Sequence, residues 1–171
     1  MKVYLDNVIV SGRVRKDLPA TEMMAVEELL ECERRGSLQI VTSRESWREQ
    51  ERTRNPATRQ ALREARPDVP VVPYDNEVFG FIYIPERNGG FISNSAVTDV
   101  IDQPLFDDLK GLGLKDADAR HLMYAARNDC HRFVTLDPDF LNNRQRLEAR
   151  CGGSRIVRPS ELFAKLSQQP P

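Results

Sequence analysis

The segment KDADARHLMYAARNDCHRFVTLDPDF, residues 115–140, carries the most informative pattern in the chain. Its first half places Leu122, Ala125 and Ala126 on one side of a helix. The run HRFVTL that follows is rich in β-forming residues and stops at Asp137. A helix that leads into an apolar strand is the unit from which parallel α/β sheets are built. We therefore predict a helix, a buried strand and a turn in this segment.

The same alternation of strand and helix patterns runs through the rest of the chain. Strand-like runs occupy residues 2–5, 38–42 and 154–157, and an amphipathic helix over 19–35 ends at Gly36, a residue suited to helix termination. Further helical patterns cover residues 43–55, 56–66, 104–111 and 159–166. Strands that alternate with helices favour the α/β class. The predicted fold is a three-layer α/β/α sandwich with a central, mainly parallel sheet.

One region departs from this alternation. Residues 69–104 are rich in proline, glycine and β-forming residues, and FGFIYIPERNGGFIS (79–93) places Asn-Gly-Gly at 88–90, between two strand-like runs. This pattern predicts a β-hairpin-like insertion. The 171 residues, 40% of them hydrophobic, suit one domain with a substantial core. We predict a single domain over 1–166 that contains the insertion, and a disordered tail over 167–171.

The composition argues against several classes of protein. Lysine and arginine number 25 and aspartate and glutamate 26, so a nucleic-acid partner would need a local basic patch or bound cations. The three cysteines are an odd number without a Cys-x-x-Cys pair, which argues against a disulfide framework or a thiolate zinc site and favours the cytoplasm. No apolar run approaches the ~20 residues that span a bilayer, so no membrane association is expected.

Four acidic residues occupy positions that a parallel sheet would bring together. Asp6 follows the first strand, Asp137 follows the strand of the 115–140 segment, and Asp118 begins the helix before that strand. Glu49 lies in the helix after the second strand. Sites in α/β sheets lie beyond the carboxyl ends of the strands. Carboxylates gathered there repel one another, and Mg²⁺ would remove that conflict. The pattern predicts metal-assisted hydrolysis of phosphodiesters.

Each acid also has a simpler interpretation. The aspartates are common helix caps and turn residues, and Glu49 could pair with an arginine such as Arg52 on its own helix. The neighbouring polar residues Asn7, Ser43 and Thr135 could orient a carboxylate or a water, or they could be ordinary polar residues at strand ends. The combination of the four acids is more specific than any one of them.

Four parts of the chain resemble the PIN-domain family of ribonucleases, to which the VapC-type toxins belong. They are VYLDNVIVSG (3–12), LQIVTSRESWREQ (38–50), KDADARHLMYAARNDCHRFVTLDPDF (115–140) and SRIVRPSELFAKL (154–166). The third is the most specific, because an Asp-Ala-x-His-Leu helix leads to a strand that ends Thr-x-Asp. The resemblance covers nearly the whole chain and implies the PIN-like version of the predicted fold. His121 keeps the register of this motif, and we expect it to pack within its helix.

The resemblance implies a metal-dependent ribonuclease that leaves a 5′-phosphate and a 3′-hydroxyl. Asp6, Glu49, Asp118 and Asp137 are the implied catalytic residues and the ligands of one or two Mg²⁺ or Mn²⁺ ions. Candidate supporting residues around them are Asn7, Ser43, Asp116, Thr135 and Asp139. The leading biological setting is the toxin of a toxin–antitoxin pair in the cytoplasm. That setting implies an RNA substrate, a small antitoxin partner and a homodimer.

The sequence departs from the family pattern in two places, and two other functions stay open. The region 69–104 is longer and richer in strand patterns than the compact family form needs, and Asp116 and Asp139 are extra acids beside the matched ones. A phosphatase of the haloacid-dehalogenase type would use Asp137 to form a phosphoaspartate, and Glu49 would then be dispensable. A non-catalytic binding module with this fold would cleave no RNA.

Overall fold

Four short parallel strands form the central sheet of the protein, in the order β2-β1-β7-β8. The structure is a computed structural model that describes residues 1–79, 82–84, 91–93 and 96–168. The strands are β1 (Lys2–Leu5), β2 (Gln39–Val41), β7 (Arg132–Val134) and β8 (Arg155–Val157). In the register of the sheet, Tyr4 on β1 pairs with Val41 and Phe133. This arrangement confirms the predicted α/β class with a parallel central sheet.

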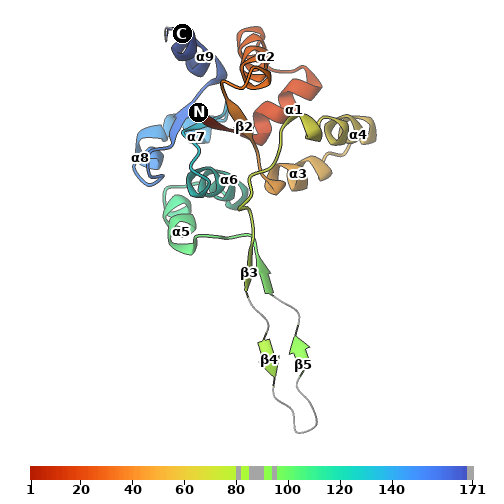
Figure 1. Cartoon of the computed structure of the whole chain (residues 1–171), viewed down its shortest axis with the longest axis vertical. Coiled ribbons are helices and arrows are strands. Elements are labelled where there is room, and N and C mark those ends of the chain that lie inside the picture. Colours follow the sequence, from red (N-terminus) through yellow and green to blue (C-terminus); the bar gives the residue numbers. More distant parts are fainter. Residues whose placement is uncertain (80–81, 85–90, 94–95, 169–171) are drawn as a thin grey trace.

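Helices connect the strands and cover the sheet (Figure 1). They are α1 (Asn7–Arg15), α2 (Ala20–Arg34), α3 (Arg44–Glu51), α4 (Pro56–Glu64), α5 (Gln103–Gly111), α6 (Asp116–Arg127), α7 (Pro138–Asn142), α8 (Arg144–Glu148) and α9 (Pro159–Ser167), with a 3₁₀ turn, η1, over Arg66–Asp68. The break between α3 and α4 follows from Asn55, whose side chain caps α4 while Pro56 begins it. Helix α8 was not predicted, because its sequence RQRLE has little apolar periodicity.

The strands bury both faces, which creates two hydrophobic cores. Alternate strand residues Tyr4, Val41, Phe133 and Ile156 contribute to one core, together with residues of α5, α6, α7 and α8. Their neighbours Val3, Leu5, Ile40, Val134 and Val157 contribute to the other core, with residues of α1, α2 and α9. Successive side chains of a strand point to opposite faces of a sheet. The two cores are therefore the two interfaces of a three-layer sandwich, as predicted.

The insertion forms a narrow arm that extends away from the sandwich (Figure 1). Strand β3 (Glu77–Phe79) pairs antiparallel with β6 (Ala96–Thr98), and β4 (Ile82–Ile84) pairs antiparallel with β5 (Phe91–Ser93). These pairs confirm the predicted hairpin-like insertion. The predicted turn at 88–90 lies outside the described residues, as do residues 169–171 of the predicted tail, whereas Ser167, the first residue of that tail, is the last residue of α9.

No helix among the described residues is both long enough and apolar enough to cross a lipid bilayer.

Helices α2 and α9 lie side by side (Figure 1), and a buried carboxylate joins them. Glu22 on α2 accepts hydrogen bonds from the backbone nitrogen of Ser160, at 3.0 Å, and from its hydroxyl, at 2.8 Å. Glu22 thus binds the first turn of α9, where backbone N–H groups have no partner within the helix.

We expect Glu22→Ala to lower the free energy of unfolding by about 1–2 kcal/mol in urea titrations. The exposed Glu28 on the same helix provides the control, and equal losses for Glu22→Ala and Glu28→Ala would contradict the prediction.

Candidate functional site

The two acids at strand ends are joined by one hydroxyl group. Asp6 follows β1, is 5% exposed, and accepts a hydrogen bond from Thr135 Oγ1 at 2.6 Å. The same Oγ1 accepts the backbone N–H of Asp137 at 2.9 Å. Because β1 and β7 are neighbours in the sheet, residues 129 positions apart meet at one edge. Asp137 also accepts the N–H of Asp139 at 2.7 Å and so caps α7, whereas the simpler interpretation of Asp137 was a turn.

The other two acids come from helices that meet beside this edge. Glu49 lies on α3 and Asp118 in the first turn of α6, and the two helices contact each other. Asp118 is not the cap of α6, because Lys115 occupies that position. Burial raises the pKa of Asp118 above its ordinary value, and the charges of Asp137 and Glu49 raise it further. Three of the four acids are therefore close enough to repel one another.

The fourth acid, Asp6, belongs to the same electrostatic group. Burial raises the pKa of Asp6 to about 6, and the charge of Glu49 acts in the same direction. The charge of His121 and the hydrogen bond from Thr135 oppose this rise. A buried carboxylate with a raised pKa is one whose ionised form lacks compensation. Each of the four predicted acids is thus near enough to at least one other for their charges to interact, and we call the four together the cluster of carboxylates at the carboxyl edge of the sheet.

Glu49 has a different environment, because a histidine binds it. His121 Nε2 lies 3.2 Å from Glu49 Oε2, and the histidine is 1% exposed. Burial alone would raise the pKa of Glu49, but the hydrogen bond and the charge of His121 bring it below its ordinary value. Burial likewise disfavours the imidazolium form of His121, yet Glu49 and Asp6 raise the pKa of the imidazole. The packing role that we predicted for His121 is therefore accompanied by a polar role.

The fit of the cluster to a divalent cation depends on donor chemistry and on geometry. Carboxylate oxygens are the ligands that Mg²⁺ and Mn²⁺ prefer. Burial, and to a lesser extent the neighbouring acids, raise the pKa values of Asp6 and Asp118, and a cation would favour the ionised form of both. Within the described ranges, no three His, Cys, Asp or Glu side chains converge closely enough to hold one ion together. The donor set fits a hard divalent ion, and the four side chains interact electrostatically without forming a coordination shell.

The predicted supporting residues divide into two groups. Ser43, Thr135 and Asn7 lie at the cluster: Ser43 Oγ is 2.6 Å from the hydroxyl of Tyr4, and the side chain of Asn7 is near enough to Glu49 to lower its pKa. The extra acids Asp116 and Asp139 are exposed and contact lysines instead. Asp116 pairs with Lys110, and Asp139 lies 3.5 Å from Lys115. The polar residues therefore contact the site acids or their partners, whereas the extra acids make ion pairs at the surface.

Tyr4 is a residue of this site that sequence reasoning missed. It lies within the first strand, where an aromatic residue indicates a buried β-strand position. Its side chain is fully buried, and its hydroxyl lies 2.6 Å from His121 Nδ1. The only signal in the sequence is position, because Tyr4 precedes Asp6 by two residues and side chains two apart share a face of a strand.

Both ends of the inserted arm are anchored on the helices that carry the acids. Before the arm, Asp75 accepts the backbone N–H of Arg44 at 2.8 Å, at the start of α3. After the arm, Asp99 lies 2.6 Å from Arg48 on α3 and 3.4 Å from Arg120 on α6. The buried Glu45 lies within ion-pair distance of the same two arginines, at 3.1 and 3.9 Å. The arm thus begins and ends beside the α3–α6 interface that holds Glu49 and His121.

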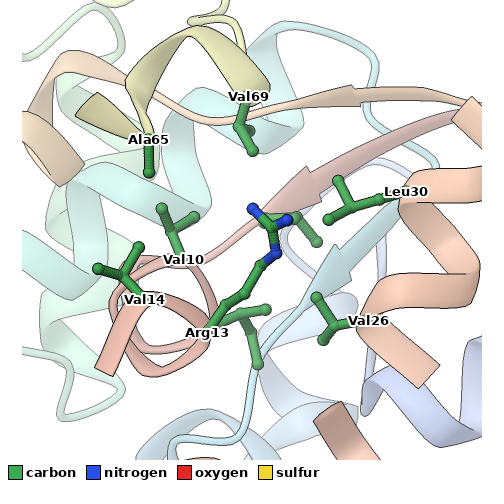
Figure 2. Close-up of a pocket in the computed structure, with 9 residues that line it drawn as sticks. Val10, Arg13, Val14, Val26, Leu30, Ala65 and Val69 are labelled. Carbon is green, nitrogen blue, oxygen red and sulfur yellow. The ribbon is translucent and has the colours of Figure 1, made fainter. Parts of the chain in front are cut away.

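A cavity elsewhere in the molecule lacks the features of an active site. It lies between α1, α2 and the segment around η1, with a volume of about 10 Å³ (Figure 2). Its lining is apolar apart from Arg13, whose guanidinium binds Glu27 at 2.8 Å and Asp68 at 3.0 Å. A space of this size holds at most about one water molecule. This cavity is therefore a weaker candidate for chemistry than the cluster of carboxylates.

Comparisons with known proteins add nothing to this assignment: no protein-family model, curated protein or solved structure matches the chain.

Proposed function

We propose that the protein is a metal-dependent ribonuclease that hydrolyses RNA phosphodiester bonds at the cluster of Asp6, Glu49, Asp118 and Asp137. The observation that carries the proposal is that these four carboxylates, which follow β1 and β7 and lie on α3 and α6, are near enough at one edge of a parallel sheet for their charges to act on one another pair by pair. Structural capping explains only Asp137 among them, because Asp6 and Asp118 make no side-chain cap. The resemblance of the sequence to PIN-domain ribonucleases supports the same reaction.

The four residues have distinct roles in this proposal. Bound Mg²⁺ or Mn²⁺ would supply a Lewis acid for the phosphate and a water of lowered pKa. Asp6 and Asp137 provide ligands from the rigid strand ends, where Thr135 fixes their relative position. Glu49 and Asp118 provide ligands from the two facing helices. The rate acceleration would come from positioning the phosphate and the water between these fixed groups.

Cationic side chains beside the acids support a polyanionic substrate. The charge of Arg52 lowers the pKa of Glu49, and that of Lys115 lowers the pKa of Asp118, so both cations lie near the cluster. Lys115 is 79% exposed. Phosphate groups bind to lysine and arginine largely without regard to base sequence. These residues would hold the RNA backbone next to the carboxylates even though the net charge of the chain is only −1.

The biological setting is a separate part of the proposal. The resemblance to VapC-type toxins supports a cytoplasmic toxin with a small antitoxin partner, and a homodimer. The absence of a Cys-x-x-Cys pair is compatible with a reducing compartment. Co-purification of the chain with the product of a neighbouring small gene, followed by measurement of RNA cleavage with and without it, would test this setting.

The reaction is tested with purified protein and a labelled single-stranded RNA. We expect cleavage with Mg²⁺ or Mn²⁺, none with EDTA, and products that carry a 5′-phosphate. Asp118→Asn and Glu49→Gln should each reduce the rate at least ~10-fold, because each removes a charged ligand with little change in shape. Retention of full activity by both variants would refute the assigned site.

The RNA cleavage assay and a phosphatase assay together distinguish the ribonuclease from the two alternatives, a phosphatase and a non-catalytic binding module. A phosphatase that forms a phosphoaspartate on Asp137 would hydrolyse p-nitrophenyl phosphate and would keep its activity in Glu49→Gln. A binding module would cleave no RNA with any divalent metal, although its circular dichroism spectrum would show that the protein is folded. Either result would replace the ribonuclease proposal.

A further inference from the structure

A buried hydrogen-bond network links three elements of the candidate site. Tyr4 Oη lies 2.6 Å from Ser43 Oγ and 2.6 Å from His121 Nδ1. The other ring nitrogen of His121, Nε2, lies 3.2 Å from Glu49 Oε2. Tyr4 and Ser43 are fully buried, and His121 is nearly so. The chain Tyr4–His121–Glu49 therefore runs from the middle of the sheet to a carboxylate at its edge.

The hydrogen-bond directions are satisfied together when both ring nitrogens of His121 carry a hydrogen. An ionised Glu49 can only accept, so His121 Nε2 must carry a hydrogen and donate it. Tyr4 donates its single hydroxyl hydrogen to Ser43 Oγ, so Tyr4 Oη accepts the hydrogen of His121 Nδ1. The tyrosine hydroxyl thus fixes the ring of His121 and, through it, the position of one oxygen of Glu49.

The network also connects the elements that carry the acids. Tyr4 lies two residues before Asp6 on β1, and His121 lies three residues after Asp118 on α6, so each shares a face with an acid. Ser43 is the residue before α3, the helix of Glu49. Glu49 is the acid most in need of support, because a glutamate side chain loses more rotational freedom on being ordered than an aspartate does. No other site acid among the described residues has a histidine as a hydrogen-bond partner.

We propose that Tyr4 and His121 are positioning residues that hold Glu49 in the orientation of a metal ligand. The inference rests on the proposed function and deepens it, because it assigns metal affinity to residues that do not bind the metal. A partner that orients a metal ligand in this way typically contributes 10–100-fold to metal affinity. The Tyr4 hydroxyl acts one step further away than His121, so its contribution should be the smaller of the two.

The test measures Mg²⁺ binding by calorimetry with the full chain and without RNA. We expect Tyr4→Phe, which keeps the buried ring and removes only the hydroxyl, to weaken Mg²⁺ binding about 3–10-fold. His121→Leu should weaken it about 10–100-fold, since Glu49 loses its donor. His121→Gln, whose amide can still donate, should recover much of that loss. In cleavage assays the variants should need more Mg²⁺ for half-maximal rate, while the KM for RNA stays near the wild-type value.

Tyr124→Phe is the matched control. Tyr124 is as completely buried as Tyr4, and its hydroxyl also has one defined acceptor, the backbone oxygen of Asp99, which belongs to none of the four acids or their partners. Tyr124→Phe should lose about as much stability as Tyr4→Phe, with unchanged Mg²⁺ affinity.

If Tyr4→Phe and His121→Leu bind Mg²⁺ as the wild type does, the inference is overturned while the ribonuclease proposal stands. If the wild type neither binds Mg²⁺ nor cleaves RNA, both are overturned. Should His121→Leu fail to fold, Tyr4→Phe and His121→Gln still decide the matter.

Discussion

At pH 7 and without metal, the free energy of unfolding of Asp6→Asn should be about 3 kcal/mol higher than that of the wild type. With metal present, the same variant should lose RNA cleavage. Burial raises the pKa of Asp6 from its ordinary value of 3.8 to about 6, and each pKa unit corresponds to about 1.4 kcal/mol. Asparagine can still accept the hydrogen bond from Thr135 but carries no charge to bury. The substitution therefore removes a destabilising ionisation and keeps the local contact.

The pH dependence of the Asp6→Asn effect follows from the direction of the pKa shift. The folded wild type binds the proton of Asp6 more tightly than the unfolded chain does, so this contribution to stability is fully present below about pH 4. It is lost as the pH rises through about 6. The free energies of unfolding of wild type and variant should accordingly be similar near pH 4 and separate between pH 4 and 7. Urea titrations in EDTA across this range would measure the separation.

Added metal should nearly abolish this difference in stability. A ligand at 100 times its dissociation constant stabilises the folded state by about 2.7 kcal/mol, which is close to the expected difference between the two proteins. Mg²⁺ should therefore raise the melting temperature of the wild type and leave that of Asp6→Asn nearly unchanged. Loss of a metal-binding charge worth several kcal/mol in the transition state should lower the cleavage rate about 10³-fold.

Asp107→Asn is the control for this experiment. Asp107 is exposed on α5, on a helix that carries none of the four acids, so its substitution should change neither stability nor cleavage. A wild type that is as stable as Asp6→Asn at pH 7 without metal would show that the buried charge of Asp6 is compensated. That result would remove the physical reason for expecting a cation beside it.

Phe133→Ala should lower the free energy of unfolding by about 3–5 kcal/mol, the largest loss of stability that we predict. Phe133 lies on β7 in the interior of the sheet and is completely buried. Its ring stacks on that of Tyr4, with centroids 5.4 Å apart, and packs against Phe140 at 4.8 Å. Removal of the ring would leave a cavity between β1, β7 and α7, and such cavities collapse only partly.

The Phe133 prediction has a control in Phe163 on α9. That ring is only partly buried, so Phe163→Ala should cause a smaller loss of stability. Guanidinium or urea unfolding, followed by circular dichroism in EDTA, would measure both variants. Similar losses at the two positions would contradict the assignment of Phe133 to the centre of the core. Phe133→Leu should recover part of the loss because it refills some of the cavity.

Much of the site could be predicted from short-range patterns in the sequence. The position of Asp6 and Asp137 at strand ends follows from apolar runs that stop at polar residues, and parallel strands place such ends at one edge. Glu49 was identifiable because it is an acid inside a helix, where capping does not apply. The strand-end positions need only the periodicity of side chains along a strand or helix and the topology of an α/β fold. The choice of Glu49 and Asp118 among neighbouring acids rests on the resemblance of the sequence to PIN-domain ribonucleases.

The partners of these residues could not be predicted in the same way. Ser43 lies 39 positions and His121 117 positions after Tyr4 in the chain. No local pattern in the sequence indicates that the polar atoms of these three residues meet. The anchoring of the arm by Asp75 and Asp99 is equally non-local. Such contacts depend on how the helices pack across the sheet. Helix packing is set by the fit of whole side-chain surfaces and not by any single residue.

The sequence by itself thus determined the α/β class, the order of the strands and of the longer helices, the insertion and the four candidate acids. Each of these follows from the chemistry of neighbouring residues, which acts over a few positions of the chain. Only the tertiary structure decided that β1 lies between β2 and β7, so that Asp6 and Asp137 share Thr135. It also decided that His121 joins Tyr4 to Glu49. Strand order and side-chain partners depend on burial of both faces of the sheet at once, a property of the folded chain as a whole.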